Sequence, residues 1–256
     1  MRFAFVLSFL TCCFAQGSPT SCIGSYKVAL NESEPLYMRD SANRRDSGIS
    51  VEFLDELVKR TGCKFSSTPL NRSRLLIELK AHRVDLVVMT VKNPTFDQVA
   101  KSIKIESVPR EMLISSTLKN KIKSIEEAMN DPSIRFLVLP AVTIYFTPEE
   151  TEKLQREQRF VTAPSIQNTF QVLKRTKNSA VIQTDFVNQY FQNTLDMKSD
   201  FTRIADQSKN YDIVIYYRSI IRPEDLTSIT QAVNEIVADG TWKKIKDKYA
   251  SVSALR

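Results

Sequence analysis

Few side chains in this chain could perform catalysis, and their small number limits the available chemistry. His82, in the segment KAHRVD, is the only histidine, so a Ser-His-Asp or Cys-His arrangement would have to use it. We expect a solvated turn residue there instead. The five glycines are too scattered to form a glycine-rich phosphate loop. The sequence therefore favours a binding protein over an enzyme, although one well-placed carboxylate would suffice for acid–base catalysis.

The N-terminus has the pattern of a secretory signal peptide. Arg2 supplies a positive charge, residues 3–14 form an almost unbroken apolar run, and residues 13–15 (CFA) offer a cleavage site. The run is shorter than the about 20 residues that a helix needs to span a bilayer. We therefore assign residues 1–15 to a signal peptide and expect a mature periplasmic chain that begins near Gln16.

Four cysteines fall into two groups. Cys12 and Cys13 lie inside the signal segment, where acylation would make a lipoprotein, which is the weaker alternative. Cys22 and Cys63 remain, and an even pair in an exported chain suggests a disulfide. Closing a loop of that length would stabilise the fold by about 4 kcal/mol. Two free thiols are the alternative, and metal binding is a poor third.

The charge pattern excludes several partners. The formal net charge is +7, with basic and acidic residues interleaved along the whole chain. No module of interleaved aromatic and basic residues points to nucleic acid, and no zinc-ligand spacing occurs. We expect a monomer with no nucleic-acid partner, metal or cofactor. The mild excess of positive charge is compatible with an acidic partner or an anionic ligand.

The first hundred residues alternate between strand and helix patterns. Strands are predicted at residues 26–30, 64–68 and 84–89, and helices at residues 49–62 and from residue 73. The last of these strands, VDLVVM, is nearly all apolar, as a parallel strand covered on both faces requires. This order indicates α/β layers joined by right-handed crossovers.

A second set of strands and helices follows. Strands are predicted at residues 111–115, 135–139, 160–163, 180–184 and 212–217. Helices are predicted at residues 124–129 and 165–174, and from residues 147, 185, 226 and 241. Thr147, Pro148 and Glu150 combine an N-cap, a first-turn proline and a carboxylate three residues on, which marks a helix start. Asp185 is predicted to cap the helix that begins there.

Four stretches of the chain resemble the family 3 extracellular solute-binding proteins, the type associated with polar amino-acid uptake. They are YKVALNESEPLY with SGISVEFLDELVKRTGCKF, NRSRLLIELKAHRVDLVVM, NSAVIQTD, and VNEIVADGTWKKIKDKY. Together they cover nearly all of the mature chain in the expected order. The resemblance implies an α/β periplasmic-binding-protein type II fold. Each of its two lobes is a mainly parallel sheet flanked by helices, and two crossover strands join the lobes.

The resemblance also implies how the chain divides between the lobes. An outer lobe would consist of residues 20–115 and 212–256, and an inner lobe of residues 116–211. The segments EMLIS and DIVIYY occupy the positions of the crossover strands. The two cysteines of the mature chain precede strands that would be neighbours in one sheet, which makes their disulfide geometrically reasonable. A ligand would bind in the cleft between the lobes, at the carboxyl ends of strands.

The resemblance implies ligand-binding residues on both sides of this cleft. They are Tyr37, Arg74 (or the nearby Arg72), Thr90 and Asn93 in the outer lobe, and Thr143 and Asp185 in the inner lobe, with Tyr145 and Gln183 as weaker candidates. Tyr37 would stack on the ligand or donate a hydrogen bond. Thr90 and Asn93 would meet a ligand carboxylate, and Asp185 would pair with a ligand ammonium group. No residue is assigned a catalytic role.

One position departs from the family pattern. Amino-acid binders of this family usually carry an arginine shortly after the threonine that corresponds to Thr90, where it clamps a carboxylate with two hydrogen bonds. This chain reads TVKNPTFDQ there, and Lys92 is the only cation in reach. A lysine is a point charge and does not replace a planar guanidinium.

The expected function is the capture of a small polar solute for an ABC-type uptake transporter. An enzyme on the same scaffold, similar to cyclohexadienyl dehydratases, is the first alternative, and Asp185 or Glu34 would then be the catalytic acid. A sensory ligand-binding partner of a membrane receptor is the second alternative.

Overall fold

The structure is a computed structural model, and it describes residues 22–40, 45–140 and 144–251. Its strands are β1 (Ser25–Asn31), β2 (Met38–Asp40), β3 (Arg45–Ser47), β4 (Lys64–Leu70), β5 (Leu86–Val91), β6 (Lys101–Ser115), β7 (Arg135–Val138), β8 (Phe160–Thr162), β9 (Ser179–Gln183) and β10 (Phe201–Tyr217). Its helices are α1 (Ile49–Thr61), α2 (Arg72–Lys80), α3 (Pro94–Asp97), the short 3-10 helix η1 (Ser116–Leu118), α4 (Ile125–Asn130), α5 (Pro148–Arg156), α6 (Ile166–Arg175), α7 (Asp185–Thr194), α8 (Pro223–Ala238) and α9 (Thr241–Ala250). Within the described ranges, no helix has both the length and the apolar character needed to cross a membrane.

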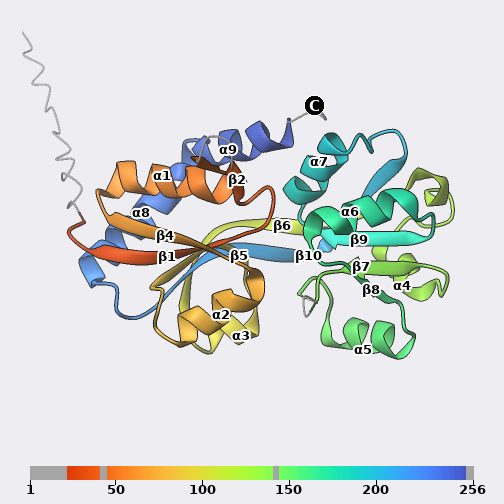
Figure 1. Cartoon of the computed structure of the whole chain (residues 1–256), viewed down its shortest axis with the longest axis horizontal. Coiled ribbons are helices and arrows are strands. Elements are labelled where there is room, and N and C mark those ends of the chain that lie inside the picture. The colour runs from red at the N-terminus through yellow and green to blue at the C-terminus, as the bar shows by residue number, and fades with distance from the viewer. Residues whose placement is uncertain (1–21, 41–44, 141–143, 252–256) are drawn as a thin grey trace, which may run out of the picture.

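Eight strands form one sheet in the order β4-β1-β5-β10-β6-β9-β7-β8, and β2 and β3 form a separate hairpin. The sheet runs through two lobes, which lie side by side in Figure 1. We call the part around β4, β1 and β5, with α1 to α3, α8 and α9, the outer lobe. The part around β9, β7 and β8, with α4 to α7, is the inner lobe. The α/β fold class predicted from the sequence is confirmed.

The outer lobe is a parallel three-strand unit with helices on both faces. β1 pairs with β4 and with β5 in parallel register. All six residues of β5 are buried, as expected for an apolar strand covered on both sides. α1 lies on one face, with Phe53 and Leu57 fully buried, and α2 and α3 lie on the other (Figure 1). Gly62 ends α1 in the left-handed conformation, with φ of 70°, which glycine adopts without steric cost.

The inner lobe repeats this plan with shorter strands. β7 pairs in parallel with β8 and with β9. The predicted helix start at Thr147 is present as a capping box, in which the Thr147 side chain accepts from the Glu150 amide and the Glu150 side chain accepts from the Thr147 amide. Phe170 and Phe191 stack with ring centroids 4.3 Å apart and join α6 to α7 across the core.

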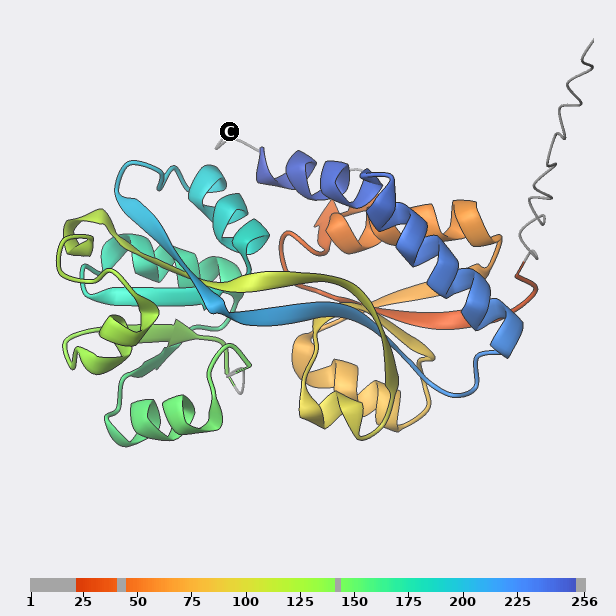
Figure 2. The ribbon, with the colours of Figure 1, turned by 180° about the vertical axis from the view of Figure 1, so that it is seen from behind.

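Two long antiparallel strands, β6 and β10, connect the lobes (Figure 2). β10 pairs with β5 near its end, and β6 pairs with β9 over Glu111–Ile114, so each strand takes part in both lobes. The register between β6 and β10 is interrupted between Asp206 and Asn210, opposite Arg110 and Pro109. The sequence predicted only residues 111–115 and 212–217 as strands. Pairing along the whole crossover extends the two strands to 15 and 17 residues.

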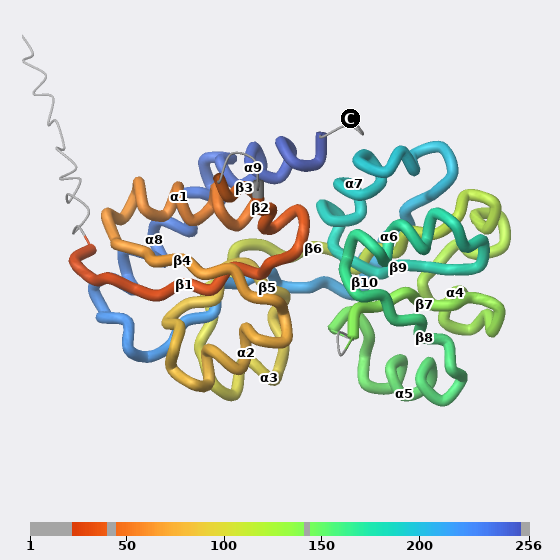
Figure 3. The backbone as a smooth tube through the Cα atoms, in the orientation of Figure 1, coloured from red at the N-terminus to blue at the C-terminus, as the bar shows by residue number. Residues whose placement is uncertain are grey.

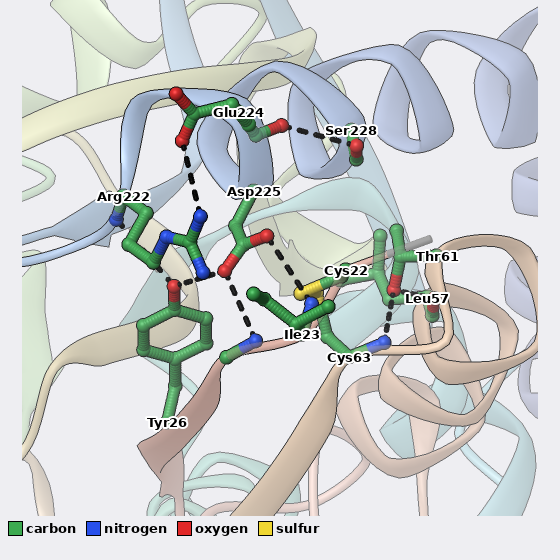
Figure 4. The surroundings of a disulfide bond; sticks show 11 residues. Cys22, Ile23, Tyr26, Leu57, Thr61, Cys63, Arg222, Glu224, Asp225 and Ser228 are labelled. Carbon is green, nitrogen blue, oxygen red and sulfur yellow. Dashed lines mark hydrogen bonds and ion pairs between the residues drawn. A yellow bond between two sulfur atoms is a disulfide. The ribbon is translucent and has the colours of Figure 1, made fainter. Parts of the chain in front are cut away.

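After β10 the chain returns to the outer lobe, where α8 contacts the residues at the start of β1 (Figure 4). The predicted disulfide joins Cys22 to Cys63, with Cα atoms 4.7 Å apart. Beside it, Asp225 in the first turn of α8 accepts hydrogen bonds from the amides of Ile23 (3.3 Å) and Gly24 (3.1 Å) and from the Tyr26 hydroxyl (2.6 Å). The first strand is therefore held covalently to β4 and by hydrogen bonds to α8.

Candidate functional site

A cavity lies between the two lobes, at the carboxyl ends of three strands. Asn31 ends β1, Thr90 and Val91 end β5, and Gln183 ends β9, as expected for a ligand site in an α/β protein. Its lining comprises Asn31, Ser33, Leu36, Arg72, Met89, Thr90, Val91, Leu139, Tyr145, Ile166, Gln183, Thr184, Phe186, Val187 and Ile213. The cavity volume is about 50 Å³. One water needs about 10–15 Å³, so the space is several times that of a single water.

Arg72 is fixed at the wall of the cavity by the local structure of α2. Asn71 caps the helix by accepting from the Arg74 amide at 3.1 Å, which places Arg72 at the first helical position. Its Nη1 donates to Thr90 Oγ1 at 3.2 Å. Its Nη2 is buried and has no hydrogen-bond partner within the protein. Burial lowers the pKa of Arg72, because a cation loses its hydration there.

Two further buried polar atoms of the cavity lack a partner in the protein. They are Asn31 Oδ1, on the outer-lobe side, and Thr184 Oγ1, on the inner-lobe side. Thr184 is the N-cap of α7, yet its side chain makes no capping hydrogen bond. A buried polar atom that lacks a hydrogen bond costs about 1–3 kcal/mol. The cavity thus presents a cationic donor, a carbonyl acceptor and a hydroxyl that a solute could engage.

The rest of the lining is mainly apolar and comes from both lobes. Leu36, Met89, Val91 and Ile213 face Leu139, Ile166, Phe186 and Val187. Met89 has φ of 58°, an uncommon conformation for a residue other than glycine. Such strained positions cluster at binding sites, where the surrounding structure holds them. Here the strain lies directly before Thr90, the partner of Arg72.

The structure brings some of the predicted site residues to the cavity and leaves others away from it. Thr90 lines it, as do the weaker candidates Tyr145 and Gln183. Tyr37 is buried elsewhere, and burial followed by the neighbouring Asp46 raises its pKa. Thr143 lies outside the described residues.

The remaining three candidates, Arg74, Asn93 and Asp185, do not line the cavity. The side chain of Arg74 is 58% exposed and pairs with Glu78 at 3.0 Å. Asn93 caps α3 by accepting from the amides of Thr95 and Phe96. The prediction that Asp185 caps α7 is wrong. The N-cap is Thr184, and Asp185 is the first residue of the helix. Its Oδ1 is buried without a partner.

Sequence reasoning did not single out Asn31 or Thr184, and it left Arg72 as a second choice behind Arg74. A signal for Arg72 existed: an N-cap at Asn71 places the next residue at the start of α2, beside the end of β5. Asn31 directly follows the predicted strand 26–30, and Thr184 ends the predicted strand 180–184. Ligand-binding residues concentrate at such strand ends in α/β sheets.

The lobes are in contact across the cavity rim. The Tyr190 hydroxyl of α7 lies 3.3 Å from Met38 Sδ of the outer lobe. Burial, followed by the neighbouring Glu34 of the outer lobe, raises the pKa of Tyr190 to about 12. Asn193 of α7 donates to the carbonyl of Ala250 at the end of α9, and Figure 3 shows these two helices side by side. The two lobes therefore contact each other directly through α7.

A buried ionic cluster supports the inner wall of the cavity at the crossover. Arg110 is only 2% exposed, and its Nη1 lies 2.7 Å from Glu150 Oε2 while its Nη2 lies 3.3 Å from Asp206 Oδ2. Tyr211 donates to the carbonyl of Tyr145 at 2.6 Å. Hydrogen bonding to Arg110 holds the pKa of Glu150 below its usual value, against the effect of burial. The cluster fixes Tyr145 against the two connecting strands.

The described residues offer no evident place for a metal. In residues 22–40, 45–140 and 144–251, no three His, Cys, Asp or Glu side chains gather as metal ligands would. Arg72 is the only charged side chain among the described residues that line the cavity. The site is arranged to hold a small solute by hydrogen bonds, one charge and apolar contact.

Two α/β lobes, joined by paired crossover strands around a cavity at strand ends, define a two-lobed solute-binding protein. The chain belongs to the bacterial extracellular solute-binding proteins, family 3, whose family model matches residues 26–252. The resemblance drawn from the sequence is confirmed. The family consists mainly of non-enzymatic proteins that bind small polar ligands and work with transporters or receptors, so the chain has a ligand-binding role.

Solved structures agree with this fold, whereas no curated protein matches the sequence. A binding component of an ABC transporter from Wolinella succinogenes, complexed with lysine, is 16% identical, with a TM-score of 0.72 and coverage of 90% of this chain and 97% of that chain. An ancestral amino acid-binding protein, a precursor of cyclohexadienyl dehydratase, is 17% identical, with a TM-score of 0.69 and coverage of 89% and 96%. The periplasmic domain of BvgS from B. pertussis is 16% identical, with a TM-score of 0.66 and coverage of 90% and 43%. At these identities the likeness shows the fold alone.

Proposed function

We propose that the chain captures a small polar solute in the cavity between its lobes and holds it by closing. The observation that carries this proposal is the convergence of three buried polar atoms, from Asn31, Arg72 and Thr184, that lack partners in the protein. A solute that completes their hydrogen bonds removes a cost of about 1–3 kcal/mol for each atom. Because these contacts need both lobes, the solute binds the closed form more tightly and shifts the population toward it.

We place the hinge within β6 and β10, where their register is interrupted beside Arg110 and Asp206. The sequence predicted the lobe boundaries after residue 115 and before residue 212. Each boundary lies a few residues from this interruption. A break in the ladder is a natural point for bending, because fewer hydrogen bonds constrain the strands there. Opening at this point would separate Tyr190 from Met38 and uncover the cavity.

We infer that the protein acts in the periplasm as a monomer that delivers its solute to a membrane partner. The pattern of residues 1–15 and the Cys22–Cys63 disulfide support export to an oxidising compartment. The similar fold of a transporter component from Wolinella succinogenes supports an ABC-type uptake transporter as the partner. The similar fold of the BvgS periplasmic domain makes a membrane receptor the second candidate.

We propose a binding role without catalysis. Neither of the two suspected acids, Glu34 and Asp185, is among the described residues that line the cavity. The similarity to a precursor of cyclohexadienyl dehydratase makes turnover of prephenate or arogenate the direct check. Steady turnover by the purified protein would replace the binding role with an enzymatic one.

The binding proposal is tested with a tryptophan placed inside the cavity. Ile166 lines the cavity at the start of α6, whereas Val172 on the same helix is 36% exposed. The mature protein is screened by thermal shift against amino acids, organic acids, polyamines and sugars. A ligand at one hundred times its dissociation constant stabilises the protein by about 2.7 kcal/mol.

We expect Ile166→Trp to fold, as judged by circular dichroism, and to lose the response to ligand. The matched control Val172→Trp retains the response. The radius of gyration of the wild type, measured by small-angle X-ray scattering, is expected to fall when ligand is added. If Ile166→Trp responds like the wild type, or if no compound in the screen stabilises the protein, the proposed site is wrong.

A further inference from the structure

We propose that the solute is a small monoanionic hydroxy-carboxylate with an apolar body, and that Arg72 binds its carboxylate; this rests on the proposed function. The cavity presents one cationic donor, one carbonyl acceptor and one hydroxyl within apolar walls. A molecule with a carboxylate, a hydroxyl and a short hydrocarbon chain matches all four features.

Arg72 takes the place of the arginine that the sequence lacks after Thr90. It reaches the same threonine from the preceding helix α2. Its Nη1 donates to Thr90 Oγ1 at 3.2 Å, which fixes one edge of the guanidinium. The buried Nη2 then remains for a second acceptor. A guanidinium donates only, and its strongest hydrogen bonds go to anionic oxygens such as those of a carboxylate. Arg72 therefore identifies the acidic end of the solute.

The charge of the cavity favours a solute with a single negative charge. Arg72 is the only charged side chain among the described lining residues, so the lining carries one positive charge. Burying a charge is costly unless an opposite charge accompanies it, and a monoanion provides this compensation. A cationic solute would add a second positive charge. A zwitterion would bring an ammonium group into a lining that offers it no carboxylate.

Asp185 is the carboxylate that could favour an ammonium group instead, and its position argues against this. It precedes Phe186 and follows Thr184, which both line the cavity, but it does not line the cavity itself. Asn188, three residues further along α7, donates to Glu111 Oε1 of β6 at 3.1 Å, and residues three apart share one side of a helix. Asp185 therefore lies on the side of α7 that faces β6.

The other two unpartnered atoms call for a hydroxyl. The Asn31 carbonyl oxygen accepts only, so the solute must donate a hydrogen bond to it. The Thr184 hydroxyl can both donate and accept. A solute hydroxyl can therefore donate to Asn31 while it accepts from Thr184. A neutral hydroxyl completes both contacts without the charge that an ammonium group would add.

A matched set of compounds separates these chemistries. Titration calorimetry compares 2-hydroxy-4-methylpentanoate with leucine, 4-methylpentanoate and 2-hydroxy-4-methylpentanamide, and repeats the comparison with the corresponding four-carbon set. The hydroxy acid is expected to bind at least about tenfold more tightly than the other three. The amide loses a hydrogen bond to a charged group, which contributes about 1.5–3 kcal/mol, and 4-methylpentanoate leaves Asn31 and Thr184 unsatisfied at about 1–3 kcal/mol each. Leucine buries an ammonium group without an opposite charge. The compounds share one hydrocarbon skeleton, so the apolar contribution cancels.

Variants of the same helix test the role of Arg72. Arg72→Gln is expected to weaken binding of the hydroxy acid by about 10- to 100-fold and to leave the amide unaffected. Arg72→Lys keeps the positive charge but lacks the planar guanidinium. Its affinity for the hydroxy acid is expected to lie between those of the wild type and Arg72→Gln. Lys80→Gln, which removes an exposed positive charge from the end of α2, is the matched control and is expected to change binding less than twofold.

The outcomes distinguish this inference from the proposed function. If leucine binds more tightly than the hydroxy acid and loses affinity in Asp185→Asn, the monoanion is wrong while the binding function stands. If Arg72→Gln binds the hydroxy acid as tightly as the wild type, Arg72 is not the anchor. If no member of either set binds, and no compound of the broader screen does, both proposals are wrong.

Discussion

The two ends of strand β1 carry buried polar sites of opposite design. At its start, Asp225 is 2% exposed and accepts three hydrogen bonds, two from backbone amides and one from Tyr26 (Figure 4). At its end, Asn31 is 6% exposed, and its carbonyl oxygen has no partner in the protein. A single strand of seven residues separates a satisfied polar site from an unsatisfied one.

The two sites differ in what their hydrogen bonds contribute to the protein. A completed hydrogen-bond set in a buried site stabilises the fold, and here burial and Asp225 raise the pKa of Tyr26 to about 12, so its hydroxyl stays a donor. An incomplete set lowers the stability of the fold but can be completed by a ligand. The first site therefore supports stability, and the second is the site that we propose for binding.

The largest expected effect comes from the disulfide beside the satisfied site. Replacing Cys22 and Cys63 together by serine opens a loop with a sequence separation of 41. The free energy of unfolding is expected to fall by about 4 kcal/mol, since the unfolded chain gains conformational entropy. Urea denaturation measures the loss, and the reduced wild type is the control. Solute affinity is expected to stay unchanged at temperatures where the variant is folded, and equal stability of variant and wild type would contradict the prediction.

The next largest effect is expected from removing the carboxylate of Asp225. Asp225→Ala leaves two amides and the Tyr26 hydroxyl without their acceptor, which is expected to cost about 3 kcal/mol. Asp247→Ala is the matched control, because Asp247 is exposed and pairs only with Lys243 of the same helix. An exposed pair contributes at most about 1 kcal/mol. Chemical denaturation distinguishes the two variants, and equal losses would show that the completed hydrogen-bond set adds nothing.

A smaller effect of opposite sign is expected in the cavity. Thr184→Val removes a buried hydroxyl that lacks a partner and keeps the shape of the side chain. The protein without solute is expected to gain about 1 kcal/mol in stability. The affinity for the solute is expected to fall, because one of its contacts is lost.

The control for this variant is Thr176→Val, since the Thr176 hydroxyl is exposed and donates to the Val172 carbonyl at 2.8 Å. Stability measurements and titrations on both variants test the comparison directly. A loss of stability in Thr184→Val would mean that its hydroxyl has a partner, and the cavity would then resemble the Asp225 site.

The smallest effect is the pH dependence of the ion pairs that Glu78 forms with two exposed arginines. Hydrogen bonds from Arg83 and then Arg74 hold the pKa of Glu78 at about 2. A lowered pKa in the folded state stabilises the fold above the ordinary value of about 4.3, and this contribution is lost as the pH falls through that range toward 2. Thermal midpoints between pH 6 and pH 2 are expected to fall less steeply in Glu78→Gln than in the wild type. Glu126→Gln, which removes an exposed carboxylate of α4, is the control, and identical slopes for both variants would contradict the assignment.

Much of the fold was predictable because its signals are local. The apolar run of β5 and the helical spacing of Phe53 and Leu57 predict their elements correctly, since burial repeats with the period of the backbone. The capping box at Thr147 was predicted from three residues and is present. The disulfide followed from an even pair of cysteines in an exported chain. The first half of β6 was missed because pairing with β10, far away in the sequence, makes it a strand.

The α/β layers and the family can be read from the sequence alone, because they depend on patterns within single segments. Which polar side chains meet depends on how distant segments pack against each other. Arg72 rather than Arg74 reaches Thr90, because side chains along a helix turn by about 100° for each residue, and packing of α2 on the sheet selects which one points at the cavity. The meeting of Asn31, Arg72 and Thr184 depends on two lobes closing on each other, and no segment of the chain carries that information alone.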